Sequence, residues 1–150
     1  MTPTVRVQAT PFDLAAEMAA LTCNRSGIGG IGCFIGLVRD DPAHPLHTLT
    51  LEHYPGMTEA AMTAIAEQAC QRWSLLGCTL LHQVGPLPVG AEIVLVLTAA
   101  GHRGPALDAT AFLIDWLKTK APFWKSETFV DGQTRWVAAR TADEDAALRW

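Results

Sequence analysis

The chain has 150 residues and a mass of 16.2 kDa, enough for one domain whose core buries roughly two thirds of the extended surface. Apolar residues make up 49% of the sequence and charged residues 17%, which excludes an intrinsically disordered chain. The formal net charge of −4 and the lack of basic runs argue against binding to nucleic acids or anionic membranes. Any anionic ligand therefore needs a local cluster of cations. The longest apolar run is too short for a membrane span, and with no signal-peptide pattern and no Cys-x-x-Cys pair we expect reduced thiols in a cytoplasmic protein.

The N-terminal half contains patterns for a strand, a short helix and two further strands. Valines alternate with polar residues over residues 5–7, which predicts a strand. Residues 11–21 are typical of a short helix with Asp13 as its N-cap. The β-prone segments 31–38 and 49–54 flank a loop rich in proline and histidine, and we predict that they pair as a hairpin.

The middle of the chain carries the clearest helix. Over residues 58–73, apolar side chains recur every three or four positions, as on the buried face of an amphipathic helix. Residues 78–84 and 92–99 are predicted strands, separated by a turn-rich segment at residues 85–91. The second of these strands is apolar on both faces, so we expect it near the centre of a sheet.

The C-terminal third predicts a second long helix and a closing hairpin. Pro105 suits the first helical position, and the helix should run to Lys120, because the residue after it precedes a proline. Segments 123–130 and 134–139 flank Asp131-Gly132, a turn dipeptide that favours a hairpin. The acidic tail predicts one more helical turn. The apolar stripe of the long helix is predicted to hold Leu107, Ala111, Ile114 and Lys118.

Together these elements predict an α+β fold in which residues 1–150 form a single domain. A mixed or antiparallel sheet would be covered by two long helices and one short helix. No internal repeat or low-complexity linker divides the sequence.

The glycines at positions 27, 29 and 32 match the G-x-G-x-x-G pattern of dinucleotide-binding loops. Such a loop needs a strand before it and a helix N-terminus after it, whereas here a helix precedes the glycines and a β-prone run follows. A nucleotide loop is therefore the weaker alternative. We interpret the glycines as a turn with close backbone approach where a strand begins.

The histidines and cysteines do not form a recognisable metal site. None of the five histidines and four cysteines pair at the short spacings of zinc sites, so we expect no metal and no bound cofactor. Cys33 could serve as a nucleophile or a persulfide carrier, but its apolar neighbours would raise the thiol pKa. Packing in the core is the favoured interpretation for Cys33.

Arg39 and the pair His102-Arg103 each follow an apolar strand, and the pair also precedes a helix whose N-terminus favours anions. Taken singly, each group is more simply a solvated surface residue. If the two strands are neighbours with matching ends, the three side chains would converge on a site for one anion.

The chain has three lysines, Lys118, Lys120 and Lys125, and all lie within eight residues of one another. Eight arginines supply the positive charge elsewhere. The helix macrodipole stabilises cations at a helix C-terminus by ~0.3–1 kcal/mol, but it does not explain the choice of lysine. Lysine differs because it can lose its proton when desolvated, attack a carbonyl carbon or stabilise a developing anion. Nearby aromatic residues supply apolar surroundings that lower a lysine pKa: Trp116, Phe123 and Trp124.

Five strings of the sequence stand out for their order and spacing: VR at Val38-Arg39, LTLEHYPGMTE at residues 49–59, HR at His102-Arg103, LKTKAPFWKSE at 117–127 and RWVAAR at 135–140. From about residue 5 to Trp150, the chain thereby resembles the large, catalytic subunit of molybdopterin synthase. This resemblance implies an enzyme that converts cyclic pyranopterin monophosphate into molybdopterin by inserting two sulfurs. It also implies that the sulfur arrives as a thiocarboxylate at the Gly-Gly C-terminus of a small ubiquitin-like partner. A homodimer flanked by two partner chains, a heterotetramer, is expected.

The resemblance also assigns roles to individual residues. The paired lysines of the family match Lys118 and Lys125, while Lys120 is interpreted as a helix-terminal charge only. Lys118 would orient the thiocarboxylate and stabilise the charge that appears as sulfur attacks. Lys125 would donate a proton or support the charge when oxygen leaves.

The substrate-contacting segments of the family match a wider set: Leu37, Val38, Arg39, His102, Arg103, Lys118, Lys125, Ser126 and Glu127. Arg39, His102 and Arg103 would bind the substrate phosphate. The chain departs from the family at Leu37 and Ser126, where many relatives carry basic residues, and it lacks an aromatic residue often found near position 107.

Two other functions stay open. The chain could be a non-catalytic module that docks a ubiquitin-like tail, or an enzyme that uses Lys118 as a Schiff-base nucleophile on a phosphorylated metabolite.

Overall fold

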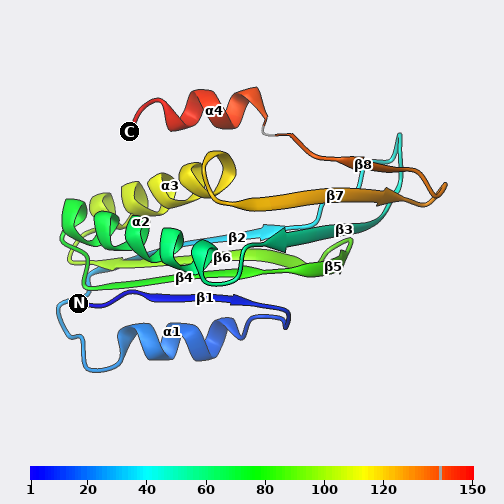
Figure 1. The fold of residues 1–150 in the computed structure, drawn as a ribbon. Helices are drawn as coiled ribbons and strands as arrows, with labels where there is room; N and C mark the ends of the chain where they lie inside the picture. The colour runs from blue at the N-terminus through cyan, green and yellow to red at the C-terminus, as the bar shows by residue number, and fades with distance from the viewer. Residues whose placement is uncertain (139) are drawn as a thin grey trace.

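The protein folds into two four-stranded sheets packed with helices, as seen in a computed structural model that describes residues 1–138 and 140–150 (Figure 1). We name the larger central layer sheet A. It holds, in spatial order, β1 (Thr4–Gln8), β4 (Gly77–Gln83), β6 (Glu92–Ala100) and β2 (Gly30–Leu37). The first pair is parallel and the other two are antiparallel. Strands β4 and β6 are buried nearly throughout, which confirms the prediction that the apolar segment at 92–99 is central.

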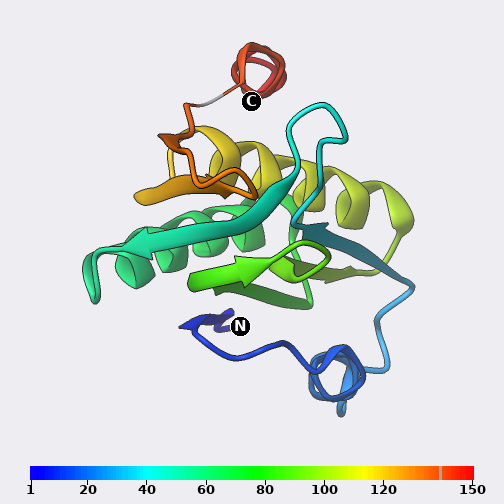
Figure 2. The ribbon, with the colours of Figure 1, turned by 90° about the vertical axis from the view of Figure 1, so that its right-hand side faces the viewer.

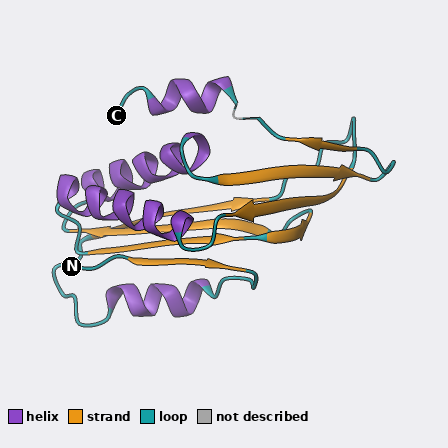
Figure 3. Cartoon of the chain, viewed as in Figure 1, coloured by secondary structure: helices purple, strands orange, loops and turns teal. Residues whose placement is uncertain are grey.

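Three helices cover sheet A (Figure 3). The long helices α2 (Met57–Trp73) and α3 (Arg103–Thr119) lie together on one face, and α1 (Leu14–Thr22) lies on the other (Figure 2). Asp13 caps α1 as predicted, because its carboxylate accepts a hydrogen bond from the N–H of Ala16 at 3.0 Å. The apolar stripe of α2 is buried as expected: Met62, Ile65, Ala66 and Ala69.

The second layer, sheet B, is antiparallel and extends beyond one end of sheet A (Figure 1). Its strands, in spatial order, are β5 (Gly85–Pro88), β3 (Leu46–His53), β7 (Phe123–Phe129) and β8 (Thr134–Trp136). The predicted turn at Asp131-Gly132 joins β7 to β8, and Gly132 adopts a φ of 89°, in the left-handed region that favours glycine. Residue 139, the last of the predicted strand 134–139, lies outside the described residues.

The last helix, α4 (Thr141–Ala147), confirms the helical turn predicted for the tail. It is held against α3 by the two residues that end the chain. The indole N–H of Trp150 donates to Asp115 at 2.6 Å, and the guanidinium of Arg149 contacts the same carboxylate at 3.0 Å. The Trp150 ring also packs edge-on against Trp73 and Phe112.

The α+β class is confirmed, but two details of the prediction are wrong. Segments 31–38 and 49–54 do not pair as a hairpin: β2 pairs with β6 in sheet A, and β3 pairs with β5 and β7 in sheet B. The strands form two sheets, and the four helices of the described residues are the three predicted ones and α4 in the tail. The segment 85–91, predicted as a turn, contains the short strand β5. Pairing partners depend on distant parts of the chain, which a local apolar pattern does not contain.

The glycines of the G-x-G-x-x-G match mark a close backbone approach, as predicted. A Cβ on Gly29 would overlap the carbonyl oxygen of Gly101, and one on Gly32 would meet the α3 residues Ala106 and Thr110. A strand rather than a helix follows them, so the arrangement differs from a dinucleotide-binding loop.

Cys33 is solvent-exposed on β2, so the predicted core packing is wrong, although burial by its neighbours does raise the pKa of the thiol. The side chain lies on an edge strand, which sequence alone did not reveal. In the described part of the chain, no helix combines the length and apolar character needed to cross a membrane.

Candidate functional site

Lys118 is placed by the last turn of α3. The buried face of this helix differs from the predicted stripe: Leu107 is 57% exposed, and the residues that pack on sheet A and α2 are Ala106, Ala109, Thr110, Phe112, Leu113 and Leu117. Lys118 follows Leu117 at the border of that face, and its side chain is half-buried. Its burial was therefore predicted correctly, but from the wrong set of neighbours.

The chain then turns and returns along β7, which brings Lys125 back to Lys118. The N–H groups of Lys120 and Ala121 both bond to the carbonyl of Trp116 and end the helix. Lys120 itself is exposed at this end, in agreement with its interpretation as a helix-terminal charge. Side chains alternate along a strand, so Phe123, Lys125 and Glu127 share one face of β7.

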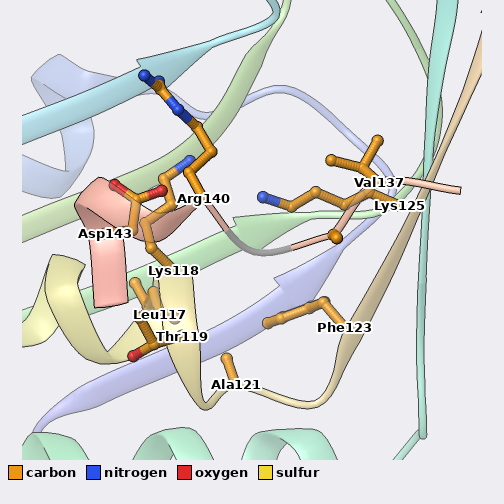
Figure 4. Close-up of a pocket in the computed structure, with 10 residues that line it drawn as sticks. Leu117, Lys118, Thr119, Ala121, Phe123, Lys125, Val137, Arg140 and Asp143 are labelled. Atoms are coloured by element: carbon orange, nitrogen blue, oxygen red, sulfur yellow. The ribbon is translucent and has the colours of Figure 1, made fainter. Parts of the chain in front are cut away.

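The two lysines meet in a cavity of about 200 Å³ (Figure 4). Lys118 comes from α3 and Lys125 from β7, while the C-terminal segment contributes Arg140 and Asp143. The remaining lining residues are Leu117, Thr119, Ala121, Phe123, Val137 and Ala138. Three cationic side chains and one carboxylate line the space, a local excess of positive charge in a chain whose net charge is −4. Such a cavity favours an anionic ligand.

Among the side chains that line the cavity, Lys125 has the clearest change in pKa. Burial and, to a smaller extent, the neighbouring charge of Lys118 together lower the pKa of Lys125 from its ordinary 10.5 to about 8, while Asp143 opposes the shift. A lysine with this pKa can give up or regain a proton near neutral pH, as a general acid or base requires.

Three residues of this site were not among the predicted site residues. Arg140 and Asp143 reach the cavity only because the chain end anchors α4 on α3, a contact between segments far apart in sequence. His82 is 4% exposed on β4 and stacks on Phe123, with the ring centroids 3.8 Å apart. A single histidine inside an otherwise apolar strand was the available signal for it.

Arg39 lies at the lysine end of sheet A. His82 pairs with Val94, and Val94 pairs with Gly36, so these three residues form one row across the sheet. Arg39 comes three residues after Gly36, beyond the end of β2, and is exposed.

His102 and Arg103 lie at the opposite end of sheet A. Strands β2 and β6 are neighbours but antiparallel, with Gly30 opposite Ala100. The eight residues of β2 span roughly 27 Å, so the His102-Arg103 pair is far from Arg39. The condition of matching strand ends is not met, and one chain does not bring these three cationic groups together.

The other predicted substrate-contacting residues surround Lys125 and Arg39. The Val38 side chain is 3% exposed in a core cluster, and its N–H and C=O already bond to Ala91 and Gly90, whereas Leu37 is 54% exposed. On β7, Glu127 pairs with Arg135 at 3.2 Å, and Ser126 lies on the face away from Lys125. Among the described residues, no group of three histidine, cysteine or acidic side chains could hold a metal ion.

The fold and the cavity together define an α+β protein with a paired-lysine site for an anionic ligand. The sequence profile of the MoaE protein family matches residues 7–120. The chain is 50% identical to the molybdopterin synthase catalytic subunit of Ralstonia nicotianae, over 99% of this chain and 84% of that protein. It also resembles the solved structure of molybdopterin cofactor biosynthesis protein E from Burkholderia multivorans, with 47% identity and a TM-score of 0.84 over 100% and 97% of the two chains.

A more distant structure shares the fold. It is the complex of subunits 1 and 2 of the molybdopterin-converting factor of Helicobacter pylori, at 18% identity and a TM-score of 0.72 over 91% of this chain and 90% of that one. The chain described here belongs to the MoaE protein family.

Proposed function

We propose that the chain is the catalytic subunit of a molybdopterin synthase, which transfers sulfur to cyclic pyranopterin monophosphate. The observation that carries the assignment is the convergence of Lys118 and Lys125 in one cavity, with the pKa of Lys125 near 8. Family membership supplies the reaction class, since the relatives above carry this name. We expect residues 1–150 to act as one domain in the cytoplasm.

The sulfur donor is the thiocarboxylated C-terminus of a small ubiquitin-like carrier protein. A narrow anionic tail fits a cavity of about 200 Å³ that is lined mainly by cations and small apolar groups. The Helicobacter pylori relative was solved as a complex of two subunits, which supports a partner of this kind.

Lys118 and Lys125 divide the chemistry between them. Lys118 orients the thiocarboxylate, whose sulfur bonds to the pterin side-chain carbon as the C–O bond to the leaving oxygen breaks, and it stabilises the negative charge of that step. Lys125, with its pKa lowered by burial, donates a proton to the oxygen that leaves. Water then hydrolyses the resulting thioester, which leaves sulfur on the pterin and an ordinary carboxylate on the carrier. Arg39, at the same end of sheet A, binds the substrate phosphate.

A second copy of the chain supplies the remaining cations. His102 and Arg103 are exposed at the N-terminus of α3, too far from the lysines of their own chain to act with them. Strand β2 forms an edge of sheet A and carries the apolar run Ile31 to Leu37, and a long apolar edge strand favours pairing or packing with another chain. A symmetric homodimer would place the pair from one copy near the lysine cavity of the other.

Reconstitution tests this function directly. Purified chain is mixed with cyclic pyranopterin monophosphate and the carrier, either thiocarboxylated or with an ordinary carboxylate terminus. Dithiolene product is expected only with the thiocarboxylated carrier. Product that forms equally with both carriers, or with neither, would overturn the proposal.

The lowered pKa of Lys125 also favours a second candidate, a Schiff-base lysine enzyme, because an amine attacks a carbonyl only in its neutral form. Borohydride in the presence of a phosphorylated carbonyl compound would then trap a covalent adduct on a lysine. Sulfur transfer requires no such adduct, so mass spectrometry of the treated chain separates the two functions.

A further inference from the structure

The segment that joins the two lysines is held by a residue far away in sequence. Thr58, in the first turn of α2, is 0% exposed, and its hydroxyl donates to the carbonyl of Pro122 at 3.2 Å. The same oxygen accepts the N–H of Tyr54 at 3.0 Å. A valine at this position would match the volume of Thr58 but make neither bond.

The next residue, Phe123, lies next to two histidines. The His82 ring stacks on it with centroids 3.8 Å apart and an interplanar angle of 18°, and His53 lies 6.4 Å away at 30°. His82 is itself fixed, because Nδ1 donates to the carbonyl of Gln83 at 2.9 Å. Nε2 of His53 contacts Glu59 at 3.2 Å. Phe123 is therefore packed against residues outside its own strand, with the closest contact to the His82 ring.

These restraints act at the wall of the lysine cavity. Phe123 and Lys125 share one face of β7, and both line the cavity (Figure 4). His82 lies behind Phe123 and is almost completely buried. Burial lowers the pKa of His82 to about 3, and the charges of Lys125 and Lys118 act in the same direction. The ring is therefore neutral at physiological pH and adds no third positive charge behind the lysines.

We propose that Thr58 and His82 are positioning residues, which hold Pro122 and Phe123 so that Lys125 stays on the cavity wall opposite Lys118. The proposal rests on the proposed function for its catalytic meaning, but its test does not depend on sulfur transfer. A displaced Pro122-Phe123 segment would carry Lys125 outward and admit water around its amine. A purely structural role would instead leave the surroundings of Lys125 unchanged in any variant that still folds.

The small number of lysines makes this testable by nuclear magnetic resonance. In protein labelled with [ε-¹³C]lysine, only Lys118, Lys120 and Lys125 give side-chain signals, and single Lys→Arg variants assign them. The titration of Lys125 is then followed in the wild type and in Thr58→Val and His82→Leu, both chosen to preserve volume. The charged groups that line the cavity with Lys125 are Lys118 on α3 and Arg140 and Asp143 at α4, and the titratable rings behind them are His82 and, next to it, His53. None of these is changed in Thr58→Val.

We expect the pKa of Lys125 to rise by about one unit or more in both variants, since water replaces the dry surroundings of the amine. Thr58→Ser should retain the wild-type titration, because the hydroxyl is kept. Thr63→Val is the matched control: Thr63 also lies on α2 and also donates to a backbone carbonyl, that of Glu59, at 2.8 Å. Loss of this hydrogen bond in Thr63→Val should leave the pKa of Lys125 unchanged.

A folded Thr58→Val or His82→Leu chain, verified by its amide spectrum, in which Lys125 titrates as in the wild type would overturn the proposal. So would an equal shift in Thr63→Val. With active enzyme, the turnover number of Thr58→Val should fall about tenfold while KM for the carrier stays the same, since misplacement of a catalytic group mainly affects the chemical step. If the chain does not transfer sulfur at all, the titration shift is still expected, so that failure of the two proposals can be distinguished.

Discussion

At the scale of single residues, Lys125 shows how a reactive group is obtained at the expense of stability. Its ammonium is brought into a cavity beside a second lysine, and burial lowers its pKa to about 8. In the unfolded chain the same group has its ordinary pKa of 10.5. Because the folded pKa is the lower one, protonated Lys125 destabilises the native state below pH 8. This penalty disappears as the pH rises from about 8 to 10.5.

Lys125→Met should therefore stabilise the protein while it removes the proposed proton donor. The gain at pH 7 is expected to reach up to about 3 kcal/mol in the free energy of unfolding, at ~1.4 kcal/mol for each unit of pKa shift. Urea unfolding at pH 7 and at pH 10 measures it, with Lys120→Met as the control for an exposed lysine. No gain at pH 7, or the same gain at both pH values, would contradict the assigned burial of the amine.

At the scale of elements, the backbones next to the start of β2 and the end of β6 approach closely just before α3. A Cβ on Gly29 would overlap the carbonyl oxygen of Gly101, a backbone atom that cannot rotate away. Directly after this contact, His102 and Arg103 open α3. The contact thus connects the glycine-rich turn to the proposed phosphate ligands.

Gly29→Ala should destabilise the fold by about 3 kcal/mol, because the added methyl group forces the two backbones apart. Gly104→Ala serves as the matched control, since a Cβ there would meet no atom within 4 Å. Alanine in a helix is favoured over glycine, so this control should be neutral or stabilise by about 0.5 kcal/mol. Thermal unfolding measures the stability of the two variants, and equal stabilities would contradict the close contact at Gly29.

Elements governed by local interactions were predictable, whereas their partners were not. The Asp13 cap, the buried stripe of α2 and the Asp131-Gly132 turn each depend on residues a few positions apart, and all three were predicted. The wrong hairpin and the unforeseen strand β5 concern which strand pairs with which. That choice is made by contacts between distant segments, which one sequence does not display.

Some residues of the candidate site were likewise predictable from the sequence, and others were not. Composition identified the segment that holds all three lysines, and the family resemblance then singled out Lys118 and Lys125. Arg140 and Asp143 were missed because their place depends on the packing of α4, which Trp150 anchors on Asp115. The distance between Arg39 and His102 depended on strand direction, a property that alternation of apolar residues does not encode.

At the scale of the whole molecule, the account requires two copies of the chain for one complete site. Lysines and Arg39 lie at one end of sheet A, and His102 with Arg103 at the other. Lys118→Ala and Arg103→Ala should each be inactive or strongly impaired alone. When the two are unfolded together and refolded, half of the dimers are mixed, and one of the two sites in each mixed dimer is intact.

Mixing should therefore restore about a quarter of the wild-type activity per chain, given random pairing of the two variants. The dithiolene product is measured at equal total protein before and after mixing. Activity no higher than the average of the two separate variants would show that the lysines and the Arg103 side chain act within one chain, or that Arg103 is not part of the site.

The most direct test of the central claim compares Lys118→Ala with Lys120→Ala in single-turnover sulfur transfer from the thiocarboxylated carrier to cyclic pyranopterin monophosphate. Both variants remove one lysine from the same end of α3, but only Lys118 lines the cavity with Lys125. The account predicts a loss of at least about a hundredfold for Lys118→Ala, a typical effect of removing one electrostatic stabiliser, and near-normal transfer for Lys120→Ala. Near-normal transfer by a folded, carrier-binding Lys118→Ala chain would contradict it.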